Sequence, residues 1–253
     1  MRLIDSHAHL DDRAFAKDRA AVIVRCFEAS IGVITIGADL ESSREAVRLA
    51  ARHRGIWATV GVHPHDAKTV TDAVLSELET LAGRAVGIGE IGLDYYRDLS
   101  PRDVQRRVFA DQLALARRLE LPVAIHDRES TDDLLAILRD GAERYRGVIH
   151  SFLGDRVLAE TFLDLGFHLG IGGPITFPKR GALREAVRSI PIDRLLLETD
   201  CPYLTPVPYR GRRNEPAYVR YVAEAVAEAK DVSVDEVASR TTENAVRLFA
   251  LDV

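Results

Sequence analysis

Short apolar runs alternate along the chain with longer segments whose apolar residues recur about every three or four positions. The runs are rich in Val, Ile and Leu, as in parallel strands that are buried on both faces. Each run is followed by a helical pattern, of which Arg102–Leu119 is a clear example. The expected strands are Arg2–Asp5, Gly32–Ile36, Ile56–Val62, Ala85–Ile91, Pro122–Ile125, Gly147–Ile149, Phe167–Ile171 and Arg194–Leu197.

Eight strand–helix units in 253 residues predict an α/β protein built as a closed (β/α)8 TIM barrel. An open, doubly wound sheet is the alternative, although no Gly-x-Gly-x-x-Gly motif opens a helix in this sequence. We expect residues 1–253 to form a single domain, because the sequence contains neither a linker nor a low-complexity stretch. The last helical pattern, Val232–Val253, is expected to pack against the outside of the barrel.

The composition and net charge indicate which classes of protein and partner to expect. The apolar share of 47% and charged share of 29% are ordinary for a globular enzyme. A net charge of −5 disfavours a broad duplex-binding surface but leaves room for a local phosphate pocket. Because neither a membrane-spanning run nor a signal peptide is apparent, we expect a cytoplasmic protein with no membrane contact and no obligate protein partner. A disulfide between Cys26 and Cys201 is not expected.

Polar residues concentrate where the expected strands end. In a TIM barrel these carboxyl ends meet at one face, which carries the catalytic groups. Six of the eight histidines lie in such positions. The segments concerned are Asp5–His9, Gly61–His65, Gly89–Asp94, His126–Glu129, His150–Phe152 and Glu198–Cys201.

The first segment contains His7 and His9. On an extended strand, residues two positions apart point to the same side, roughly 6.5 Å from one another, so both imidazoles can bind one ion. The alternative is a pair of histidines hydrogen-bonded to the backbone. Four further candidate ligands at other strand ends favour the metal site.

Glu90 ends an apolar, glycine-rich strand, where an unpaired carboxylate would be costly to bury. It either pairs with an arginine or bridges two cations. Many barrel metallohydrolases use a modified lysine as the bridge, but none of the four lysines here ends that strand. Glu90 can take this role by position and charge.

His126 and His150 close two short strands and, with Glu90, offer a second set of nitrogen and oxygen ligands. Asp200 can bind the first ion and contact its water. Two ions about 3.5–4 Å apart can lower the pKa of a shared water from about 15.7 towards 7, and Asp200 is placed to accept its proton. The catalytic candidates are therefore Glu90 and Asp200. Such sites accept Zn²⁺, Mn²⁺, Ni²⁺ and, less readily, Mg²⁺.

Taken together, several motifs resemble those of TatD-type metal-dependent deoxyribonucleases, and the resemblance covers nearly the whole chain. The motifs are His7-Ala-His9, Gly61–His65, Gly89–Tyr96, Glu198–Leu204 and Arg213–Tyr218. The resemblance implies a two-metal barrel of the amidohydrolase kind that hydrolyses DNA phosphodiesters, often stepwise from the 3′ end. It implies that one ion is bound by His7, His9, Glu90 and Asp200, and the other by Glu90, His126 and His150. Leu153 stands where many relatives have serine, a difference that bears on substrate preference rather than on metal binding.

Candidate substrate contacts surround these ligands. We expect His63 to face the pocket and donate to a phosphate oxygen, while strand alternation through Pro64 turns His65 away. Guanidinium groups fit phosphate oxygens bidentately, and aromatic rings can stack on a terminal base. For each of these residues, ordinary surface exposure or packing is the alternative. The candidates are Arg128, Arg210, Arg212, Arg213, Tyr95, Tyr96, Tyr203 and Tyr209.

The main functional hypothesis is a two-metal 3′–5′ exodeoxyribonuclease acting on DNA ends, with single strands favoured. One alternative keeps the metals but hydrolyses an ester or amide of a small molecule or an aminoacyl-tRNA, since fold does not fix function. The arginine-rich loop at 210–213 favours a phosphate substrate. A non-catalytic metal-binding barrel is the third possibility, but it predicts gaps in the ligand set, and all six ligand positions are filled.

Overall fold

The computed structural model describes residues 3–140 and 145–253, so Arg2 of the first expected strand lies outside the described residues. Eight strands form one parallel sheet in chain order. The strands are β1 (Leu3–Ala8), β2 (Ile31–Ile36), β3 (Ile56–Val60), β4 (Gly87–Asp94), β5 (Val123–Arg128), β6 (Gly147–Ile149), β7 (His168–Ile171) and β8 (Leu195–Leu197). A bridge between Ala8 and Cys201 and a bond from the Asp200 N–H to the His7 carbonyl join β8 to β1. The nearly closed barrel confirms the TIM-barrel prediction, and the open sheet is wrong.

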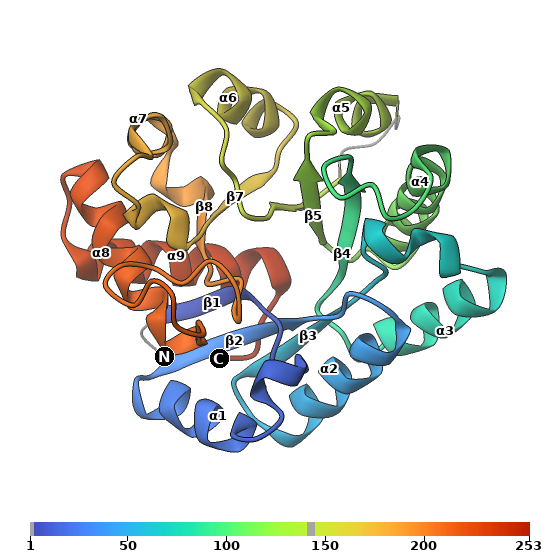
Figure 1. Ribbon diagram of the computed structural model, residues 1–253, viewed down its shortest axis with the longest axis horizontal. Helices are drawn as coiled ribbons and strands as arrows, with labels where there is room; N and C mark the ends of the chain where they lie inside the picture. Colours follow the sequence, from blue (N-terminus) through green and yellow to red (C-terminus); the bar gives the residue numbers. More distant parts are fainter. Residues whose placement is uncertain (1–2, 141–144) are drawn as a thin grey trace.

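Helices surround the strands, as Figure 1 shows. They are α1 (Arg19–Glu28), α2 (Leu40–Arg52), α3 (Asp72–Ala82), α4 (Arg102–Arg118), α5 (Thr131–Asp140), α6 (Arg156–Asp164), α7 (Gly181–Ser189), α8 (Val219–Lys230) and α9 (Val234–Phe249). Short 3₁₀ turns are η1 (Arg13–Phe15), η2 (Pro64–Thr69), η3 (Gly173–Thr176), η4 (Ile192–Arg194) and η5 (Pro216–Tyr218). Among the described residues, no helix combines the length and apolar character needed to cross a bilayer. Cys26 and Cys201 are free thiols, as expected.

The barrel interior changes character along each strand. Near the strand starts, the residues of one buried cluster are apolar; they include Ile4, Ile34, Trp57, Ala124, Val148 and Leu196. Side chains two positions apart on a strand point the same way. His126, His150 and Glu198 each follow one of these apolar residues by two positions, so the same inward row ends in polar groups.

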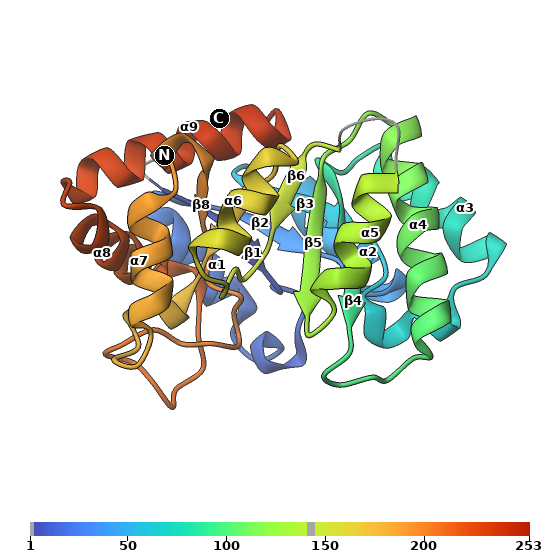
Figure 2. The same ribbon diagram turned by 90° about the horizontal axis from the view of Figure 1, so that it is seen from above.

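The C-terminal helix does not pack against the outside of the barrel, so that prediction is wrong. Figure 2 shows α9 lying across one end of the barrel, while the connections after the strands extend from the other end. Ala245, Leu248 and Phe249 of α9 belong to the same buried cluster as the inward apolar residues of the strand starts. Without this cover the apolar interior would be open to water. A single apolar helix face in the sequence cannot distinguish the side of a barrel from its end.

Candidate metal centre

Glu90 lies at the centre of the polar end of the barrel. Its side chain, on β4, is only 4% exposed. One carboxylate oxygen, Oε2, lies 3.3 Å from His7 Nε2 and 3.7 Å from His9 Nε2. Asp200 Oδ1 lies 3.5 Å from the same nitrogen of His9 and 4.0 Å from that of His7. Two histidines and two carboxylates therefore face one point.

The other oxygen of Glu90 faces a different set of nitrogens. Oε1 lies 2.8 Å from His126 Nδ1, 3.4 Å from His150 Nε2 and 3.6 Å from His63 Nε2. In the described ranges, the ion-pair partners of Glu90 are all histidines. The alternative in which Glu90 pairs with an arginine is therefore wrong. The carboxylate has the position of a bridge between two donor sets.

Burial and mutual attraction shift the pKa values of this cluster in opposite directions. Burial raises the pKa of Glu90, but the charges of His150, His63 and His7 outweigh this and hold it well below its usual range. Burial lowers the pKa of His9, but its hydrogen bond to Asp200 and the charge of Glu90 raise it to about 9. The cluster thus retains buried negative charge and recruits protons to balance it. A divalent cation can supply the same balance.

Two further carboxylates orient the histidines, and the sequence analysis gave neither of them a role. Glu198 Oε1 lies 3.1 Å from His150 Nδ1, which leaves Nε2 of that ring to face Glu90. Asp94 Oδ2 lies 3.2 Å from His126 Nε2, which leaves Nδ1 facing Glu90. Carboxylates that hold the remote ring nitrogen are a usual feature of histidine metal ligands. The available signal was their place, directly after strands in the same motifs as Glu90 and Asp200.

Two glycines make room for this arrangement. A Cβ on Gly170 of β7 would lie 2.3 Å from Oε2 of Glu198, so any other residue here would displace that carboxylate from beside the strand. Gly92 adopts φ +140°, a region that side chains rarely occupy, and its Cβ would lie 2.0 Å from the carbonyl oxygen of His126. Both positions allow a close approach next to a candidate ligand.

His63 faces the cluster as expected, but His65 is not turned away. Its Nε2 lies 2.8 Å from Oδ2 of Asp94, and the rings of His63 and His65 are 4.1 Å apart. The alternation argument failed because β3 ends at Val60 and a 3₁₀ turn, η2, begins at Pro64. The turn also fixes the tautomer of His63: its Nδ1 accepts from the backbone N–H of His65 at 3.1 Å, so Nε2 carries the ring proton.

The predicted substrate contacts differ in whether their side chains are exposed or already bonded to other residues. Tyr203 is 55% exposed, and its ring centroid is 6.3 Å from that of His9. Arg128 lies over the ring of Tyr96 at 4.0 Å. Arg210 is placed on another connection, described below. Arg213 does not extend into solvent towards a substrate, because it binds both carboxylate oxygens of Asp18 at 2.7 Å.

The remaining tyrosines also differ in exposure and in the contacts that they already make. The Tyr95 hydroxyl donates to Asp133 at 2.6 Å, so its polar end is already bonded. Tyr96 is 55% exposed beside Arg128. Tyr209 stacks on Tyr218 with their ring centroids 4.6 Å apart. Tyr96 and Tyr203 are therefore the exposed members of this set, and Tyr203 also lies next to a candidate ligand, His9.

The donor set fits divalent ions. His7 is almost fully buried. Within the described residues neither of its ring nitrogens makes a well-directed hydrogen bond, even though Nε2 lies 3.3 Å from Glu90, and this is a costly state unless another group binds there. Ligand atoms within 4.8 Å of one another form several groups, including His7–His9–Glu90 and His63–Glu90–His126. Imidazole and carboxylate together are suited to Zn²⁺, Mn²⁺ and related ions.

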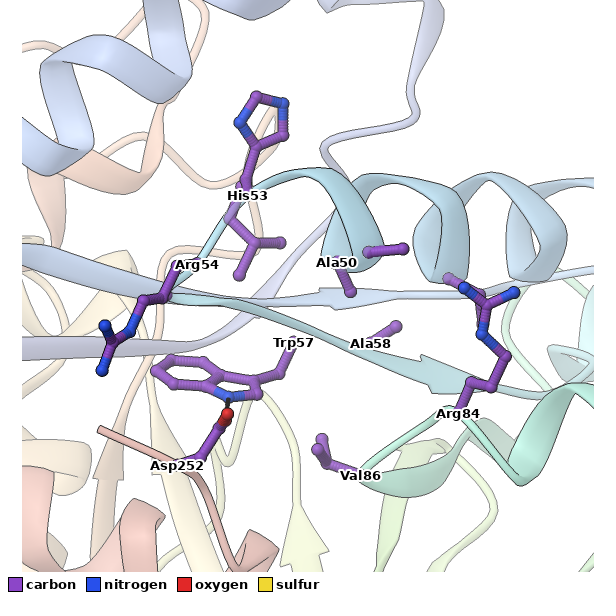
Figure 3. A pocket seen from close by; sticks show the side chains of 12 residues that line it. Ala50, His53, Arg54, Trp57, Ala58, Arg84, Val86 and Asp252 are labelled. Carbon is purple, nitrogen blue, oxygen red and sulfur yellow. Dashed lines mark hydrogen bonds between the residues drawn. The ribbon is translucent and has the colours of Figure 1, made fainter.

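A hollow lies at the other end of the barrel, where the strands begin. It occupies about 300 Å³ beside the start of β3 and is lined by Arg54, Trp57, Arg84 and Asp252, among others (Figure 3). The Trp57 indole N–H donates to Asp252 at 2.7 Å, which ties the last residues of the chain to β3. This hollow contains none of the candidate ligands and is separate from the metal centre.

Comparison with known proteins agrees with this geometry. A family model for TatD-related DNases matches residues 4–250. The chain is 43% identical to the uncharacterised metal-dependent hydrolase YabD of Bacillus subtilis, covering 99% of this chain and 100% of that protein. It is 38% identical to the 3′–5′ ssDNA/RNA exonuclease TatD of Klebsiella pneumoniae, covering 99% of each. The crystal structure of YJJV, a TatD homologue from Escherichia coli, superposes with a TM-score of 0.92 at 32% identity, covering 99% of each chain. The protein is therefore a metal-dependent hydrolase of the TatD family.

Proposed function

We propose that this hydrolase cleaves phosphodiester bonds at the 3′ ends of single-stranded nucleic acid, DNA above all, with two divalent ions. One ion is bound by His7, His9, Glu90 and Asp200, and the other by Glu90, His126 and His150. The observation that carries the proposal is that the two oxygens of Glu90 face two separate sets of nitrogens, at 2.8–3.7 Å. A pair of ions here would draw charge from a phosphate and lower the pKa of a water.

The chain's own residues supply the other functions. Burial raises the pKa of Asp200, but its hydrogen bond with His9 and the charges of the surrounding histidines together outweigh this and lower it, so the carboxylate is ionised and can accept a proton from water. His63 carries its proton on Nε2, directed towards Glu90, so it can donate to a phosphate oxygen bound beside that residue. Arg128 and Arg210 offer further contacts to phosphate, and Tyr203 offers a ring for the terminal base.

Relatives support this choice of bond. Two of them, from Klebsiella pneumoniae and Pantoea vagans, are named 3′–5′ ssDNA/RNA exonucleases, at 38% and 40% identity. The exposed tyrosines and arginines beside the cluster suit a nucleotide better than a small ester or amide, which would need neither. The candidate ions are Zn²⁺, Mn²⁺, Ni²⁺ and Mg²⁺.

The test is cleavage of single-stranded oligonucleotides labelled at the 3′ or the 5′ end, with each ion and with a chelator. We expect stepwise shortening from the 3′ end that chelator abolishes and added ion restores. A panel of carboxylic esters and amides is assayed in parallel. Faster turnover of that panel than of any oligonucleotide, or cleavage that survives chelation, would refute the proposal.

A further inference from the structure

The rim around the metal centre is unevenly charged. Two stretches after β7 and β8 contain no acidic residue: residues 172–184, which run into the first turn of α7, and residues 201–214, which lie between Asp200 and Glu215. They contain six basic residues: Lys179, Arg180, Arg184, Arg210, Arg212 and Arg213. Residues 127–133, from the end of β5 into the first turn of α5, contain four acidic residues and one arginine. In a chain with a net charge of −5, a polyanion is attracted to the β7–β8 side of the rim and repelled from the β5 side.

The two basic connections are fastened to one another. The Val207 N–H donates to the hydroxyl of Thr176 at 2.9 Å, and the guanidinium of Arg210 lies 3.8 Å from the ring centroid of Phe177. Figure 2 shows them side by side at the lower edge, beyond the strand ends. Asn214, fully buried, donates to the carbonyls of Thr199 and Tyr203 and so ties down the base of the second connection.

Arginines on this side lie over aromatic rings. Arg212 lies 5.8 Å from the ring centroid of Tyr209, and Arg220 lies 4.5 Å from that of Tyr221. The rings of Tyr209 and Tyr221 are 5.4 Å apart, so the two arginines belong to one cluster. A ring beneath a guanidinium restricts its motion. Arg220 donates one N–H of Nη2 to the Tyr221 hydroxyl, and its other N–H groups face no carboxylate among the described residues, so they can bind phosphate oxygens.

These three exposed residues, Arg210, Arg212 and Arg220, are here called the arginine strip. Over residues 3–140 and 145–253, none of the three is held by a carboxylate at salt-bridge distance. Their neighbour Arg213 shows the contrast, since its guanidinium is fully used by Asp18. Unpaired guanidinium groups on a rigid surface are well suited to binding phosphates.

We propose that the arginine strip binds the sugar-phosphate backbone of a single-stranded nucleic acid beyond its terminal nucleotide. The inference rests on the proposed function, because it assumes that the strand end lies at the metal centre. The connection that carries Arg210 and Arg212 begins directly after Asp200 and passes Tyr203, which is beside His9. A strand on the strip therefore leads to the centre. Phosphate contacts carry no sequence information, so the strip selects for strand length and not for base sequence.

The test compares thymidine oligomers of 2, 5 and 20 nucleotides. For the wild type we expect KM to fall by about tenfold or more from the shortest to the longest. In Arg212→Ala/Arg220→Ala most of this length dependence is lost. The slope of log Kd against log salt for the 20-mer decreases by about 1.4, since each lost phosphate contact removes about 0.7. The matched control, Arg52→Ala/Arg107→Ala, makes the same charge change on α2 and α4, on the other side of the barrel from α7 and α8 (Figure 1), and keeps the wild-type dependence.

The outcomes separate the two proposals. If the double variant and the control show the same length dependence, the strip is not the strand track, whereas metal-dependent cleavage would still support the proposed function. If the wild type cleaves no oligomer with any ion, the proposed function fails. The strip is then judged by Kd for the 20-mer alone, measured by fluorescence anisotropy in chelator, and equal values for variant and control overturn it.

Discussion

At the end where the strands begin, the inward side chains are apolar and α9 covers them; at the end where the same strands finish, they are histidines and carboxylates. Ala124 and His126 on β5 are two residues apart and point into the same interior, as do Val148 and His150 around the end of β6. The first residue of each pair contributes to apolar burial, whereas the second faces Glu90.

The two ends of the barrel therefore contribute with opposite sign to the free energy of unfolding. Apolar burial at the α9 end stabilises the fold by roughly 25 cal/mol for each Å² removed from water. The polar end buries the carboxylates of Glu90, Asp94 and Glu198 and partly buries that of Asp200, next to histidines that must share protons to balance them. A bound cation would offset the cost of this buried negative charge, so substitutions at the two ends should have separable effects.

The largest effect is expected from Glu90→Gln. Glutamine keeps the shape of the side chain but removes the charge that faces both donor sets. We expect metal-dependent cleavage of a labelled oligonucleotide to fall by about a thousandfold or more, because a metal clamp on a phosphate provides several kcal/mol. Retention of wild-type kcat/KM in this variant would show that Glu90 is not a bridge.

Phe249→Ala tests the opposite end. Phe249 of α9 is 2% exposed within the apolar cluster, so its truncation should cost about 3–5 kcal/mol of unfolding free energy, measured by urea denaturation. Metal affinity per folded chain should stay within about twofold, since no candidate ligand contacts this residue. If Phe249→Ala weakened metal binding as much as substitution of a candidate ligand does, the two ends of the barrel would not be energetically independent.

Asp94→Asn sharpens the role of an orienting carboxylate. Asp94 receives hydrogen bonds from His126 and His65, and its loss should weaken ion binding by about 10–100-fold, as for other partners of metal-bound histidines. Titration with Mn²⁺ or Zn²⁺ gives the affinity directly. The control is Asp98→Asn, an exposed residue paired with Arg102, for which no change is expected. Equal affinities in the two variants would remove the orienting role.

The smallest effect is expected from pH at His168, the first residue of β7. Burial and the charge of Arg194 lower its pKa to about 4, and its Nδ1 has no hydrogen-bond partner among the residues that the structure describes. The unfolded chain, with a pKa near 6.5, binds more protons between these values, so stability falls as pH drops from about 6.5 to 4. Allowing for partial exposure, the loss is about 1–2 kcal/mol. In His168→Gln this part of the dependence of unfolding free energy on pH should vanish, as measured by urea denaturation at several pH values. An unchanged dependence in the variant would show that other groups cause it.

How much the sequence could predict differs between these ends too. Continuous apolar runs predicted the strands. The positions of His7, His9, His126 and His150 at strand ends followed, because a barrel brings those ends together. Asp94 and Glu198 were assigned no role, since their contacts depend on ring orientations that a sequence does not encode. His65 was misplaced because a 3₁₀ turn interrupts the alternation at Pro64. The place of α9 could not be predicted from an apolar face alone.

The most direct test of the central claim is the number of ions per chain, measured by elemental analysis after loading with Mn²⁺ or Zn²⁺ and removal of free metal. The account predicts two ions in the wild type and two in Phe249→Ala, but fewer than one in Glu90→Gln. Fewer than two ions in the wild type, or two in Glu90→Gln, would contradict a two-ion centre bridged by this carboxylate.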